Sequence, residues 1–147
     1  MSIVERIREE QKVALKAGEK ERLSGLRLLS SELKNRSIEL GREPTDEEAI
    51  EVLMRALKQR RESEEQFTRG GRTELAAREA AEAEVIRSFL PEPLSDEDLD
   101  ALIDAAIAET GATSMREMGA VMGIVMPAVK GRAEGSAVSA RVKERLG

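Results

Sequence analysis

The apolar residues of this chain recur at steps of three and four, which is the spacing of one face of an α-helix. No stretch alternates apolar and polar residues as a half-buried strand does, and the β-branched residues never fall into such an alternation. Four prolines and long charged runs point the same way. We therefore predict an all-α protein. The clearest apolar stripe is Leu23, Leu26, Leu29 and Leu33, which Ile38 and Leu40 are expected to close.

Capping and stop signals divide this pattern into seven predicted helices. A Ser or Thr followed three residues later by Glu forms a capping box, in which each side chain accepts a hydrogen bond from the other residue's backbone N–H. Helices are therefore expected to start after Ser2, Thr45 and Ser114, and Ser95 is expected to cap another. The remaining three are predicted over 20–40, over 73–89 and at the C-terminus, on the inner face formed by Val138, Val142 and Leu146. In the helix after Ser114, Met115, Met118, Met122, Val125 and Val129 are expected to form the apolar face, and Pro127 predicts a kink or an early end.

The segment Leu90-Pro91-Glu92-Pro93 is the strongest break in the chain. Two prolines so close together stop a helix and stiffen the connection that follows. We predict an N-terminal domain of helical hairpins over residues 1–90 and a small three-helix tail domain over residues 94–147. The tail domain is short, so its core is expected to be thin and to pack against a neighbour or a partner.

The missing residue types restrict the chemistry that the chain can perform. It contains no Cys, His, Trp or Tyr, which excludes Ser-His-Asp and Cys-His catalysis and any metal site that needs histidine ligands. Gly70-Gly71-Arg72 lacks the lysine and the spacing of a phosphate-binding loop. We predict no metal, no cofactor and no catalytic centre. An enzyme that acts alone, with carboxylates, Lys, Ser and Thr as its only reactive groups, is the least favoured alternative.

The net charge is −5 and is unevenly distributed. Residues 94–112 contain six acids and no base, whereas residues 113–147 carry six bases and three acids. An acidic total argues against broad nucleic-acid binding, but the basic end permits a small, directed contact. The charged N-terminus resembles no signal peptide, and no apolar run approaches the roughly 20 residues of a membrane span. We expect a cytoplasmic protein without a membrane contact.

The six residues 130–135 form a predicted turn with two cations and two glycines. Such a turn, with its N–H groups and cations directed outward at a helix start, can hold a phosphate group. A plain corner, with glycines that only permit the turn and cations in solvent, has the same spacing. The spacing alone favours the corner.

Charged residues interrupt the apolar faces of the third and fourth predicted helices. If these helices pair antiparallel about the Gly70-Gly71 turn, the charges meet and form cross-helix ion pairs, which fix register more than they add stability. A catalytic or metal-binding carboxylate site is the less favoured alternative, because nearby arginines would hold the carboxylates ionised and occupied. The residues concerned are Arg60, Arg61 and Glu64 on one helix and Glu79 and Glu82 on the other.

Several short motifs together resemble the YqeY family over nearly the whole chain. That family is the free-standing relative of the C-terminal region of the B subunit of aspartyl/glutamyl-tRNA amidotransferase. The motifs are Lys20-Glu21-Arg22-Leu23, Arg60-Arg61-Glu62-Ser63, Glu65-Gln66-Phe67, Gly71-Arg72-Thr73, Phe89-Leu90-Pro91, Gly111-Ala112-Thr113-Ser114-Met115, Met118-Gly119-Ala120-Val121-Met122-Gly123 and Lys130-Gly131-Arg132-Ala133.

The resemblance implies an all-helical two-part fold and an association with tRNA. In the amidotransferase, the similar region is an appendage that engages the tRNA body, and the kinase, amide-transfer and glutaminase centres lie elsewhere. The family label of carbon–nitrogen ligase with glutamine as amide donor would then describe the complex and not this chain. The residues expected to contact RNA are Lys130, Gly131, Arg132 and Ala133, with Arg141 and Lys143 from the basic end. The alternative is a helical protein-interaction module, with a protein partner in tRNA metabolism.

Overall fold

The computed structural model describes all 147 residues and is built from seven α-helices, one short 3-10 helix and no strand. The prediction of an all-α fold is confirmed. The chain divides into two compact units, Met1–Leu90 and Pro91–Gly147. The division falls at the start of the predicted Leu90–Pro93 break, and each unit has an apolar core of its own.

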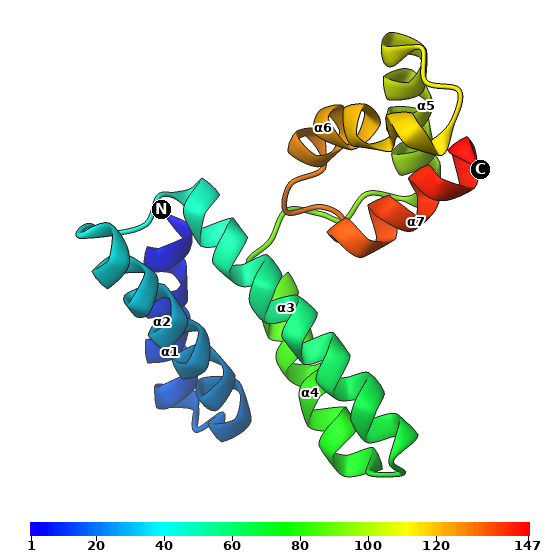
Figure 1. Ribbon diagram of the computed structural model, residues 1–147. Helices are drawn as coiled ribbons and strands as arrows, with labels where there is room; N and C mark the ends of the chain where they lie inside the picture. Colours follow the sequence, from blue (N-terminus) through cyan, green and yellow to red (C-terminus); the bar gives the residue numbers. More distant parts are fainter. The chain divides into compact units, whose positions relative to one another are not determined.

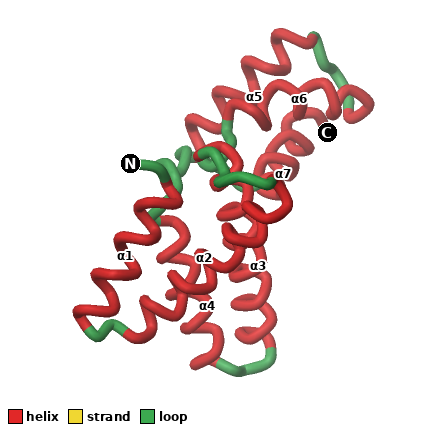
Figure 2. The backbone as a smooth tube through the Cα atoms, turned by 90° about the vertical axis from the view of Figure 1, so that its left-hand side faces the viewer, coloured by secondary structure: helices red, strands yellow, loops and turns green.

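The N-terminal unit consists of two helical hairpins. Helices α1 (Ile3–Ala17) and α2 (Lys20–Leu40) form the first, and α3 (Asp46–Arg69) and α4 (Thr73–Arg87) form the second. Each pair lies side by side in both Figure 1 and Figure 2. The core between the helices includes Ile7, Leu26, Leu29, Leu53, Leu57, Ile86 and Phe89.

Local hydrogen bonds explain why these helices begin and end where they do. The capping boxes of Ser2 with Glu5 and Thr45 with Glu48 are both formed, as predicted. Gly18 and Gly41 follow α1 and α2 with φ of 70° and 71°, a left-handed conformation that costs glycine little. The boundaries of α2 agree with the prediction at both ends.

The C-terminal unit contains three helices and a single 3-10 turn. They are α5 (Asp96–Thr110), η1 (Met115–Glu117), α6 (Met118–Ala128) and α7 (Gly135–Leu146). Ser95 caps α5 by accepting a hydrogen bond from the Asp98 N–H. The core is formed chiefly by Leu99, Ile103, Val121, Val125, Val129, Val138 and Val142.

Four local predictions are wrong or only partly right. The Ser114 side chain makes no cap; instead the Glu117 carboxylate accepts a hydrogen bond from the Thr113 N–H at 3.1 Å, and the chain first forms a 3-10 turn. Ile38 is 70% exposed and does not close the α2 stripe. Helix α4 stops at Arg87, two residues early. In α6 the buried face centres on Val121, Val125 and Val129, with Met118 and Met122 only partly buried and Met115 exposed.

Candidate functional site

The turn after α6, which we call the tail turn (residues 130–135), is held mainly by inward hydrogen bonds. Pro127 lies in the last turn of α6, which ends one residue later, so the early end is the outcome observed. The N–H groups of Arg132 and Ala133 both donate to the carbonyl of Val129, at 2.8 and 3.1 Å. These two donors therefore point into the turn and not at a ligand, as expected for a plain corner.

Arg132 also binds the segment that opens the C-terminal unit. Its guanidinium Nε donates to the carbonyl of Glu92 at 2.9 Å, and its own carbonyl accepts the N–H of Leu94 at 3.0 Å. The backbone of Arg132 is thus fixed by residues that lie some forty positions earlier. The predicted RNA-contacting residue has a structural role at this point, although its side chain remains exposed.

Gly131 is the residue of the tail turn that substitution should disturb most. It is buried and has a φ of +77°, a conformation that a Cβ atom makes unfavourable. We expect Gly131→Ala to lower the free energy of unfolding of the C-terminal unit by about 1–2 kcal/mol. Urea unfolding monitored by hydrogen exchange of the α6 and α7 amides would measure the loss. Gly123→Ala, at a helical site with open space for a Cβ, is the control and should instead stabilise.

The remaining predicted cations lie on α7, and one of them is occupied. Arg141 donates two hydrogen bonds to the Asp100 carboxylate, at 2.9 and 2.7 Å, and Arg145 lies 3.5 Å from the same carboxylate. The hydrogen bond from Arg141 lowers the pKa of Asp100. This ion pair would have to open before Arg141 could bind a phosphate group. Lys143 is exposed on the same helix and is not in the pair.

A second surface of the C-terminal unit is the outer face of α6. All residues from Met118 to Val129 are uncharged, so this helix is apolar on every side, although only one side of it is buried. An added Cβ at Gly119 or Gly123 would meet nothing within 4 Å. We call this face the α6 ridge; its exposed residues are Gly119, Ala120, Gly123, Ile124, Met126, Pro127 and Ala128.

The ridge differs in charge from the rest of its unit. Residues 91–147 contain six basic and ten acidic residues and so carry a net charge of −4. The ridge itself has no carboxylate. In the sequence, Arg116 and Glu117 precede α6, and Lys130, Arg132 and Glu134 follow it, so cations outnumber acids by three to two at its ends. A helix that is apolar all round is normally buried, so an exposed one indicates a contact surface.

In the N-terminal unit, Arg60 of α3 bridges to both predicted carboxylates of α4. Its Nη1 lies 3.0 Å from Glu82 Oε2 and its Nε lies 3.4 Å from Glu79 Oε2. The second contact is close enough for charge attraction but too poorly aligned for a hydrogen bond, and Glu79 Oε2 has no other partner. Burial raises the pKa of Glu79, an effect that Arg60 opposes. We call Arg60, Glu79 and Glu82 the Arg60 cluster.

The other two residues that were predicted to form ion pairs, Arg61 and Glu64, lie outside the Arg60 cluster. Glu64 is half-buried and near enough to Glu79 to raise the pKa of that carboxyl group. Arg61 is exposed and is engaged in an interaction of its own. Burial also raises the pKa of Glu32 on α2, whose charge Arg60 and Arg55 help to balance. The cluster thus links three helices through charge.

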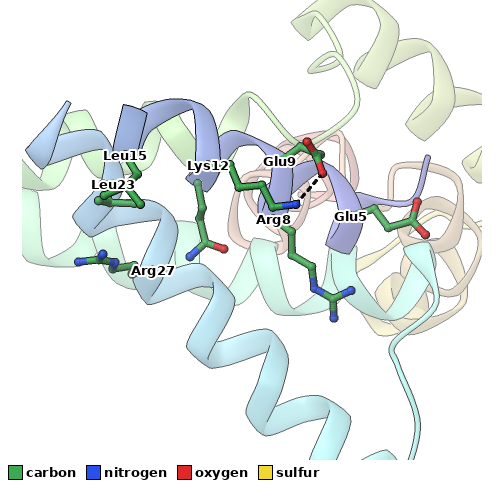
Figure 3. Close-up of a pocket in the computed structure, with 8 residues that line it drawn as sticks. Glu5, Arg8, Glu9, Lys12, Leu15, Leu23 and Arg27 are labelled. Carbon is green, nitrogen blue, oxygen red and sulfur yellow. Dashed lines mark hydrogen bonds and ion pairs between the residues drawn. The ribbon is translucent and has the colours of Figure 1, made fainter. Parts of the chain in front are cut away.

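The N-terminal unit also has a surface hollow of about 520 Å³, which lies along α1 and α2 (Figure 3). At one end Leu15 and Leu23 lie together, and farther along Lys12 binds Glu9. Arg8 is directed elsewhere, to Glu43 at 3.0 Å. The charged groups here do not converge on a common point, which a catalytic site requires. No set of three or more Asp or Glu side chains in the structure is arranged to hold a metal ion.

The fold and these surfaces define an all-helical protein of two small units with a bare apolar helix on the second. The family model described as Yqey-like protein matches residues 4–146, and the chain therefore belongs to the YqeY family. The resemblance seen in the sequence motifs is confirmed.

Two relatives are informative by their names and coverage. The chain is 28% identical over 148 aligned positions to altered inheritance of mitochondria protein 41, mitochondrial, of Pyrenophora tritici-repentis, which covers 99% of this chain and 81% of the relative. It is 30% identical over 83 positions to an uncharacterized protein of Schizosaccharomyces pombe, covering 56% of this chain and 68% of the relative. The first relative is mitochondrial by name, so a cytoplasmic location of this chain stays a prediction. No helix here has the length and apolar character needed to cross a membrane.

Proposed function

We propose that this chain is a tRNA-associated accessory protein that contacts structured RNA through the α6 ridge and the tail turn and supplies no catalytic group. The observation that carries the proposal is the uncharged ridge between cations in an otherwise acidic unit. The acidic residues of α5 repel a polyanion, whereas the ridge has no acidic residue to repel it.

The small residues of the ridge suit recognition by shape. Gly119 and Gly123 let a sugar–phosphate backbone approach the helix closely, and folded RNA is recognised largely by shape and by 2′-hydroxyl and phosphate contacts. Arg116, Lys130 and Arg132 flank the ridge in the sequence and would contact phosphates on either side of it. With two or three such contacts, affinity should fall about 10- to 40-fold between 50 and 200 mM salt.

Gly123 offers a clean test of this proposal, because a side chain there meets no neighbour. We expect Gly123→Glu to weaken binding of bulk tRNA at least about tenfold, since it places a carboxylate where phosphates approach. Gly123→Lys should strengthen binding, and Gly123→Ala measures the effect of added bulk without charge. Filter binding across a salt series would measure all three, with helical content checked by circular dichroism. Equal affinities of the Glu and Lys variants, or no binding of the wild type at 50 mM salt, would contradict the proposal.

The second candidate is a helical protein-interaction module, which the exposed side chains of Ile124 and Met126 favour. The same variants separate the two candidates. Binding of an apolar protein partner should be lost in both Gly123→Glu and Gly123→Lys, whereas RNA binding should depend on the sign of the introduced charge. A partner that binds stoichiometrically, survives nuclease treatment and is lost with both charged variants would favour the second candidate.

Amide transfer by the chain alone is not part of the proposal. The Arg60 cluster is the most buried of the ion pairs, and both of its carboxylates lie against the same arginine. ATP- and glutamine-dependent turnover by the purified chain would require a revision of this view.

A further inference from the structure

A second hollow, of about 430 Å³, lies between α2 and α4 in the N-terminal unit. Helix α4 contributes Arg78 and Glu82 to its wall, and α2 contributes Glu21, Arg22 and Ser24. Arg22 is paired with Glu10 of α1 at 3.1 Å. Both kinds of charge therefore line one space, together with a small apolar patch at Ala81. The size lies within the range of small-molecule sites in proteins.

The two charged residues that α4 contributes to the hollow, Arg78 and Glu82, do not form an ion pair with each other. Arg78 and Glu82 are four residues apart on one face of the helix, a spacing that usually allows an ion pair. Glu82 is turned instead to Arg60 of α3, with Oε2 at 3.0 Å from Nη1. Arg78 is left exposed at the hollow with its donors directed to no carboxylate.

The Arg60 cluster, which lies beside the hollow at Glu82, has two carboxylates and one cation. Glu79 and Glu82 share one guanidinium, that of Arg60, and Glu79 Oε2 lacks a hydrogen-bond donor. A positive group that entered the hollow at Glu82 would be attracted by the excess carboxylate of this cluster. Gly25 of α2 is buried against the other side of Glu82, where an added Cβ would lie 3.9 Å from Glu82 Cγ, so the two helices pack closely at this point.

We infer that the hollow between α2 and α4 binds a small zwitterion, such as a free amino acid, with its ammonium group against Glu82 and its carboxylate against Arg78. Ser24 supplies a hydroxyl for a further hydrogen bond, and Ala81 accepts an apolar side chain. This site is in the other unit from the α6 ridge and is independent of RNA binding.

A thermal-shift screen of the full chain with the twenty amino acids tests the inference. At least one amino acid should raise Tm, and its dissociation constant by calorimetry should be about 1 mM or lower, which corresponds to about −4 kcal/mol. Arg78→Gln and Glu82→Gln should each weaken that binding at least tenfold, and Ala81→Trp should abolish it by filling the space. Arg72→Gln, an exposed arginine at the start of α4, is the matched control and should bind as the wild type does.

Ligand analogues separate a zwitterion from a simple cation. The amine that lacks the carboxylate and the N-acetyl derivative that lacks the positive charge should each bind at least tenfold more weakly than the amino acid. The inference is overturned if no amino acid raises Tm, if the amine binds as tightly as the amino acid, or if both Arg78→Gln and Glu82→Gln retain full affinity while folded.

Discussion

Replacing Arg60 with methionine should lower the free energy of unfolding of the N-terminal unit by about 2–3 kcal/mol. The substitution keeps much of the apolar stem but leaves Glu79 and Glu82 without their shared partner. Breaking a fully buried ion pair costs roughly 3–5 kcal/mol, and a smaller value is expected here because Arg60 is still 22% and Glu82 31% exposed. Urea unfolding with hydrogen exchange of the α3 and α4 amides would measure the change.

Two comparisons show whether the unpaired carboxylates cause the loss. Lys58→Met removes an exposed cation from the same helix and should change stability by no more than about 0.5 kcal/mol. The deficit of Arg60→Met should also shrink on acidification. The pKa of Glu79 is already raised by burial, and loss of Arg60 raises it further, so protonation favours the folded state as pH falls. A deficit that is small at pH 7, or that grows in acid, would contradict this account.

Ile103→Ala should unfold the C-terminal unit while the N-terminal unit stays folded. Ile103 is fully buried at the centre of the second core, and a truncation of this kind costs about 2–5 kcal/mol. At roughly 0.05–0.15 kcal/mol per residue, the total stability of so small a unit is of similar size. The two cores share no residue, which is why the effect should be confined to one.

Hydrogen exchange resolved along the chain would test this separation. Protection should be lost throughout α5, α6 and α7 and retained in α2 and α3. Ala105→Ser, at an exposed site on α5, is the control. The variant also separates the two proposed binding activities: tRNA binding should disappear, whereas amino-acid binding between α2 and α4 should persist. Simultaneous loss of protection in both units would show that they fold as one.

The fold was largely predictable because its signals are local. Capping boxes at Ser2 and Thr45 and glycines at positions 18 and 41 each act within one helical turn, so their pattern in the sequence determines the helix ends. Ile38 was assigned to the wrong face because it lies five residues after Leu33, which is about 140° around the helix. The predicted capping box at Ser114 does not form, because the Glu117 carboxylate accepts its hydrogen bond from the Thr113 N–H.

The candidate sites were less predictable, because they depend on which helix faces which. The basic residues of the C-terminal region can be read from the sequence, but their pairing with α5 cannot. The ion pair between Arg141 and Asp100 was therefore not predicted. Which residues of α6 form the ridge could not be predicted for another reason. An all-apolar helix has no polar face to mark its outer side, and its periodicity cannot show which residues a core will cover. The uncharged run from Met118 to Val129 was the available signal.

The bare α6 ridge has a consequence for how the protein behaves in solution. The net charge of the whole protein, −5, keeps molecules apart at low ionic strength, when the repulsion extends over tens of ångströms. Added salt screens that repulsion, and sulfate or phosphate also strengthens the association of apolar surfaces. The molecule should therefore become more prone to self-association under the same conditions that weaken RNA binding. Light scattering alongside each salt titration would distinguish RNA release from the loss of free protein into oligomers.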